Sequence, residues 1–157
     1  MIKRIPVRRL VRDRRTPERA MAQPPEEDEH SSPTHQGYIR TAAQARDVTR
    51  GFLASLGASN RTEAEAVLLV VSELVTNAER HARGVTGFRL EAGPGSIMVT
   101  VSDASTDPPR LRHTNAFEPG GFGWYLVQDL AADVTVEIQP HGKSVRALLR
   151  ALLPLAH

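Results

Sequence analysis

The alternation of apolar and polar residues predicts two long helices in the first half of the domain. Between residues 41 and 57, in "TAAQARDVTRGFLASLG", apolar side chains recur at intervals of three and four, the spacing that places them on one face of a helix. Thr41 is suited to cap the start of this helix, and Gly57 is suited to end it. We therefore expect an amphipathic helix with one buried face.

The second helix is predicted between residues 59 and 84. Ser59 or Asn60 can cap its N-terminus, and Gly84 marks its C-terminal end. Its apolar stripe consists of Val67, Val70, Val71, Leu74, Ala78 and Ala82. Because residues three and four apart share a helix face, this stripe should pack against the core.

The second half of the chain contains segments with a period of two, which is typical of strands. The stretches "GFRLEA" and "SIMVTVSD" alternate in this way and are separated by "GPG". A long polar loop, the helical stretch "FGWYLVQDLAA" and two further strands, "DVTVEIQ" and "SVRALLRAL", follow. Helices and strands thus occur in blocks. This order predicts an α+β fold, a two-layer sandwich in which helices cover one face of a mixed, mostly antiparallel sheet.

Residues 1–36 differ from the rest of the chain in composition. They include "QPPEEDEHSSPTHQ", whose few apolar residues cannot offset the entropy cost of ordering. We therefore expect a disordered tail, residues 1–36, followed by one domain, residues 37–157. The tail holds eight Lys and Arg against six Asp and Glu, whereas the domain holds twelve of each. Because the excess positive charge lies in the tail, the folded domain is not expected to bind nucleic acid.

The amino-acid composition excludes several kinds of site and several classes of protein. Only 4% of the residues are aromatic, so Val, Leu, Ile and Ala must form the core. The absence of cysteine excludes disulfides and thiolate metal sites. No apolar run reaches the ~20 residues that span a bilayer, and the basic N-terminus lacks the apolar segment of a secretory signal. We expect no membrane association and a cytoplasmic location.

A polar row beside the apolar stripe of the second helix is the first candidate site. Glu73 and Asn77 lie four positions apart, and Arg80 and His81 follow within one turn. Carboxylate and amide oxygens suit a hard cation such as magnesium. A glutamate near such a cation can accept a proton from an attacking water or hydroxyl. An ordinary solvated helix edge would show the same spacing.

Three further stretches carry polar or glycine residues that can bind a ligand. Asp103 ends a strand, where a carboxylate can accept a hydrogen bond from the amine of a base or begin a turn. Gly121 and Gly123 precede and open a helix, whose N-terminal N–H groups can bind phosphate. Ser144 begins a strand and could hold a water that contacts a ligand. Each of these signals is weak alone.

The order and spacing of the four stretches resemble those of one family. From about Tyr38 onward the chain is similar to the GHKL, or Bergerat-fold, ATPases, and most like the small anti-sigma-factor serine/threonine kinases and their actinobacterial relatives. "ELVTNAERHA" resembles the N box of that family, "VSDAS" its first glycine box and "GGFGWYLVQDLAADV" its second. "GKSV" resembles the closing strand.

This resemblance implies an ATP-binding domain of the histidine-kinase-like fold, with roles assigned by matching position. Glu73 matches the catalytic base, and Asn77 matches the magnesium ligand. Asp103 matches the residue that reads the adenine amino group. The remaining matches are Arg80 and His81, which would lie near the phosphates, Gly121 and Gly123, which would contact them, and Ser144, which would hold an adenine-linked water.

The implied function is a kinase that acts as an anti-sigma factor and phosphorylates an anti-sigma-factor antagonist, with a sigma factor as its other partner. The resemblance leaves a homodimer open. The stretch "DASTD" lacks both glycines of the family's D-x-G-x-G pattern, which favours an alternative, a non-catalytic module that binds a sigma factor or another partner with weak or no ATP binding. A histidine-kinase catalytic fragment is disfavoured, because the 36 preceding residues do not supply a pair of phosphoacceptor helices.

Overall fold

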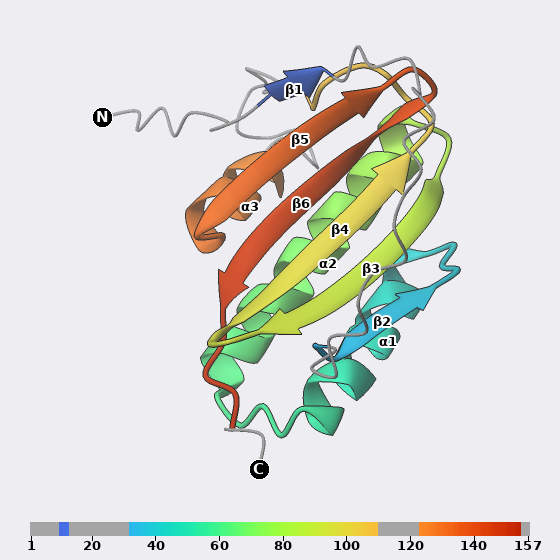
Figure 1. The fold of residues 1–157 in the computed structure, drawn as a ribbon. Helices are drawn as coiled ribbons and strands as arrows, with labels where there is room; N and C mark the ends of the chain where they lie inside the picture. Colours follow the sequence, from blue (N-terminus) through green and yellow to red (C-terminus); the bar gives the residue numbers. More distant parts are fainter. Residues whose placement is uncertain (1–9, 13–31, 110–122, 155–157) are drawn as a thin grey trace, which may run out of the picture.

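The structure, a computed structural model, describes residues 10–12, 32–109 and 123–154. Three helices and six strands lie in this part of the chain (Figure 1). In chain order they are β1 (Leu10–Arg12), β2 (Thr34–Gly37), α1 (Ala42–Ser55), α2 (Arg61–His81), β3 (Val85–Gly93), β4 (Ser96–Asp103), α3 (Gly123–Leu130), β5 (Asp133–Gln139) and β6 (Gly142–Arg150).

Both long helices begin where the sequence predicts a cap. The Thr41 hydroxyl accepts a hydrogen bond from the Gln44 N–H, and the Asn60 side chain accepts one from the Glu63 N–H. These bonds satisfy N–H groups that have no partner within the first turn of a helix, and each stabilises its helix by about 1 kcal/mol. Gly57 follows α1 with φ +69°, a left-handed conformation that favours glycine.

The sheet has the order β1-β5-β6-β4-β3-β2. Every neighbouring pair is antiparallel except β1 and β5, which are parallel. Figure 1 shows all three helices behind the sheet in the view, with no helix in front of it. The predicted α+β fold, a two-layer sandwich with a mixed, mostly antiparallel sheet, is confirmed.

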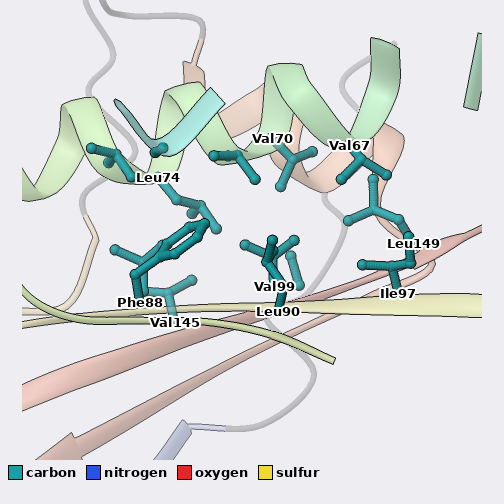
Figure 2. Packing of buried hydrophobic residues seen from close by; sticks show 14 of the residues in the cluster. Val67, Val70, Leu74, Phe88, Leu90, Ile97, Val99, Val145 and Leu149 are labelled. Carbon is teal, nitrogen blue, oxygen red and sulfur yellow. The ribbon is translucent and has the colours of Figure 1, made fainter. Parts of the chain in front are cut away.

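The core lies between α2 and the inward face of the sheet. Every residue of the predicted apolar stripe on α2, from Val67 to Ala82, is buried. Figure 2 shows Val67, Val70 and Leu74 pointing toward the side chains of the sheet, of which it labels Phe88, Leu90, Ile97, Val99, Val145 and Leu149. Full burial of one such side chain stabilises the fold by about 1.5–3 kcal/mol, so this layer holds α2 firmly on the strands.

The sheet contains two strands that the sequence analysis assigned to the tail. β2 pairs with β3 between Thr34 and Gly37, and β1 pairs with β5. The polar sequence "THQG" of β2 carries no hydrophobic alternation, so its place at the edge of the sheet comes from backbone hydrogen bonding with β3. The ordered domain therefore begins before residue 37. Within the described ranges, no helix is long and apolar enough to cross a membrane.

Candidate functional site

The polar edge of α2 lies beside the buried stripe and carries the first two candidate residues. Glu73 and Asn77 are both half-buried, whereas their neighbours Leu74 and Ala78 are fully enclosed. Arg80 and His81 lie in the last turn of the helix and are exposed. Because Glu73 and Asn77 are one turn apart, their oxygen atoms lie on the same face of α2.

Glu73 reaches across to the first residue of α3. A Cβ atom placed on Gly123 would overlap the Glu73 carboxylate, so a larger residue at this position would displace that carboxylate. The N-terminus of a helix carries unpaired N–H groups and partial positive charge. The contact therefore brings a carboxylate, on the polar edge of α2, to a helix end that is suited to bind anions.

The C-terminal end of β4 carries a second carboxylate in very different surroundings. Asp103 is only 6% exposed, and the Lys143 side chain opposite it on β6 is 7% exposed. The Lys143 ammonium donates to Asp103 Oδ1 at 3.0 Å and lies 3.0 Å from Oδ2. The backbone N–H of Ser105 also donates to Oδ1, at 2.9 Å. Asp103 is thus both the last residue of the strand and half of a buried ion pair.

The backbone approaches closely around this ion pair. A Cβ on Gly142 would overlap the carbonyl oxygen of Asp103, so glycine is required at the start of β6. Asp103 also pairs with Val85, at the start of β3, four residues after α2 ends at His81. Figure 1 shows the C-terminal ends of α2 and β4 at the same end of the molecule. Asp103 therefore lies at the end of the sheet that adjoins the last turn of α2.

Ser144 does not join the other candidates. It lies opposite Ser102 in the pairing of β4 with β6, and the two hydroxyls are 2.8 Å apart. Side chains alternate between the two faces of a sheet. Because Asp103 and Lys143 share the inward face with Val101 and Val145, Ser102 and Ser144 must lie on the face that no helix covers. The structure thus places Ser144 on the other face of the sheet from Asp103 and Lys143, and its role beside a bound base stays a prediction.

Lys143, the buried partner of the candidate residue Asp103, was missed by the sequence reasoning. A signal was present, because Lys143 precedes the alternating inward residues Val145, Ala147 and Leu149 at an interval of two. A lysine in that register is buried with them and requires an anionic partner. The partner, Asp103, lies 40 residues earlier in the chain, and only the sheet brings the two together.

The glycine-rich segment is described only from Gly123 onward, so the predicted role of Gly121 lies outside the described residues. Trp124, the next residue, is 5% exposed and belongs to the hydrophobic core. Its buried indole Nε1 has no hydrogen-bond partner among the described residues, and a buried donor without a partner costs about 1–3 kcal/mol. The start of α3 is therefore fixed by packing in the core as well as by its contact with Glu73.

The donor set suits a magnesium nucleotide better than a metal held by protein alone. In the described part of the chain, no group of three His, Asp or Glu side chains could hold a metal ion. Magnesium commonly takes one or two protein oxygens and completes its shell with water and phosphate. The Asn77 amide, the Glu73 carboxylate and the N-terminus of α3 together offer such a partial set beside an anion-binding helix end.

Comparison with known proteins agrees with this fold. Residues 36–149 match the model of the family described as the histidine kinase-like ATPase domain. A crystal structure of the RsbU and RsbW domains of Rv1364c from Mycobacterium tuberculosis matches with a TM-score of 0.56 and 18% sequence identity. The match covers 80% of this chain and 34% of that chain, so this protein spans about a third of the matched chain. No curated protein matches the sequence.

Proposed function

The chain belongs to the histidine kinase-like ATPase family, and from this premise we propose that it is an ATP-dependent protein serine/threonine kinase. The observation that supports the proposal most strongly is the contact of Glu73 with Gly123 at the start of α3. It brings a proton acceptor to the helix end that suits phosphate oxygens.

Asn77, the start of α3, Asp103 and Glu73 each have a separate role in this proposal. Asn77 supplies an amide oxygen to Mg²⁺, and the backbone N–H groups at the start of α3 bind phosphate. Asp103 accepts a hydrogen bond from the amino group of the adenine. Glu73 would take the proton of a serine hydroxyl on the substrate as the serine oxygen bonds to the γ-phosphorus, the bond from that phosphorus to the bridging oxygen breaks and ADP leaves. ATP would supply the phosphoryl group, and Mg²⁺ would offset its charge.

The proposed substrate is an anti-sigma-factor antagonist, and the proposed second partner is a sigma factor, so the protein would act as an anti-sigma factor. The resemblance of "ELVTNAERHA" and "GGFGWYLVQDLAADV" to the boxes of such kinases supports this assignment. The fold match to a structure that contains an RsbW domain is consistent with it.

The proposal is tested by phosphoryl transfer from labelled ATP to a candidate antagonist. We expect Glu73→Gln to lower the rate by about 10²-fold or more, because a positioned general base contributes about 10²–10⁴-fold. Glu79→Gln is the matched control, since Glu79 lies on the same helix but is exposed, and it should transfer phosphate at the wild-type rate. Equal labelling by wild type and Glu73→Gln would remove Glu73 as the base.

A second candidate function is a partner-binding module with weak or no ATP binding. The absence of both glycines from "DASTD" favours it. Calorimetry with Mg-ATP separates the two functions, because the kinase must bind the nucleotide, whereas the module binds it weakly or not at all. Absence of a binding signal at millimolar nucleotide would favour the module.

A further inference from the structure

The Asp103–Lys143 ion pair has hydrogen-bonding capacity that its own contacts do not use. A carboxylate has about four acceptor positions, and an ammonium has three N–H donors. Asp103 Oδ1 accepts from both Lys143 and Ser105, whereas Oδ2 contacts only Lys143 among the described residues. The pair therefore retains one acceptor position on Oδ2 and one N–H on Lys143.

Stability alone gives little reason to bury such a pair. Removing two charges from water is costly, and a fold with apolar residues of similar volume in place of a buried ion pair is often equally stable or more stable. Both side chains keep a small exposed fraction, 6% for Asp103 and 7% for Lys143. Both also lie at the rim of the inward face, where β4 ends and β6 begins. The pair thus borders the core at one end of the sheet and keeps a small part of each side chain exposed there.

We propose that Lys143 determines the base specificity of the site by donating a hydrogen bond to N1 of adenine, while Asp103 Oδ2 accepts one from the 6-amino group. This assignment rests on the proposed nucleotide-binding function. The Watson–Crick edge of adenine presents one donor, the amine, next to one acceptor, N1, which complements the remaining acceptor and donor of the pair. Lys143 then acts directly on the base, in addition to positioning Asp103.

The same count of unused donor and acceptor positions predicts that guanine binds more weakly than adenine. The edge of guanine presents one acceptor, O6, and two donors, N1–H and the 2-amino group. One free position on Asp103 Oδ2 can take only one of these donors, since Ser105 and Lys143 engage the other oxygen. The second N–H of guanine would lose its hydrogen bond to water without forming one to Asp103 or Lys143, and that loss weakens binding.

The first experiment changes the ligand and leaves the protein intact. Calorimetry compares Mg-ATP with the triphosphates of 1-deazaadenosine, which has C–H in place of N1, and of 7-deazaadenosine, which keeps the whole recognised edge. A hydrogen bond to a charged group is worth about 10- to 100-fold in affinity. We expect 1-deaza-ATP to bind wild type about 10- to 100-fold more weakly than ATP, and 7-deaza-ATP to bind like ATP. Equal affinities for ATP and 1-deaza-ATP would overturn the role of Lys143.

The second experiment asks whether Lys143, and not a water, reads N1. Lys143→Met alone leaves a buried carboxylate unpaired and is expected to destabilise the fold, so the informative protein is Asp103→Asn/Lys143→Met, which has no buried charge. Its Asn oxygen still accepts from the 6-amino group. The difference between ATP and 1-deaza-ATP should shrink to within about twofold, since no donor to N1 remains.

Arg146→Met provides the matched control. Arg146 lies on the same strand, faces the opposite side of the sheet and pairs with Glu137 at 3.6 Å. Its loss should leave the preference for ATP over 1-deaza-ATP unchanged. A preference that persists in the double variant would overturn the proposal, since another group would then read N1. Failure of wild type to bind any of the three nucleotides would instead reject the nucleotide-binding function itself.

Discussion

The two carboxylates of the site, Glu73 and Asp103, lie in opposite kinds of surroundings. Asp103 is buried, and an ammonium and a backbone N–H donate to it. Glu73 is half-buried against the bare backbone of Gly123, and no residue in the described ranges forms a hydrogen bond or ion pair with it. A carboxylate with fixed donors is held in one orientation and suits recognition. A carboxylate with unused acceptor positions suits proton or cation binding.

The largest expected effect comes from breaking the pair at Asp103. Lys143→Met should lower the free energy of unfolding by about 3–5 kcal/mol, because it leaves a buried charge without a partner. Asp103→Asn/Lys143→Met should recover most of that loss. Urea unfolding of both variants measures the difference. If the single variant were as stable as wild type, Asp103 would be well solvated and the contrast with Glu73 would disappear.

The next largest change in stability is expected for a substitution at Gly123, which contacts Glu73. Gly123→Ala places a methyl group where the carboxylate lies, so the end of the Glu73 side chain must move away from the start of α3. Loss of its interaction with the helix end costs about 0.3–1 kcal/mol. The matched control is Gly51→Ala in α1, where a Cβ would meet nothing within 4 Å. Because alanine is the better helix former, this control should gain about 0.5–1 kcal/mol. Thermal unfolding of the two variants should therefore shift in opposite directions.

Glu73 itself should contribute little to stability. Glu73→Gln removes only the interaction of its charge with the start of α3, which is worth about 0.3–1 kcal/mol. For Glu73→Gln, urea unfolding should therefore show a small change in stability, whereas the phosphoryl-transfer assay should show a large change in rate. A loss of stability comparable to that of Lys143→Met would indicate that Glu73 has a structural role.

The smallest effect is expected at Ser144, on the uncovered face of the sheet. Ser144→Ala removes the contact with Ser102, but both positions are only half-buried, so the change in stability should stay within about 0.5 kcal/mol. Nucleotide affinity measured by calorimetry should not change. A clear loss of ATP binding in this variant would restore Ser144 to the site and contradict the assignment of Lys143.

Much of the fold could be predicted because its signals are local. The caps at Thr41 and Asn60, the apolar stripe of α2 and the period of two in β4 and β5 each lie within one segment. β2 was not predicted, because its four residues have no such period and their pairing depends on β3. The face on which Ser144 lies could not be predicted either, since it depends on the register of β6 and a shift of one residue moves a side chain to the other face of a strand.

For this protein, the sequence by itself determined the helices, most of the strands, the α+β class and the polar row on α2, because hydrophobic period and capping act over a few neighbouring residues. Tertiary structure alone decided which distant groups meet: Glu73 with Gly123, and Asp103 with Lys143. Those contacts depend on strand register and on the packing of α3 against α2. Neither is fixed until the whole sheet and its helices have assembled.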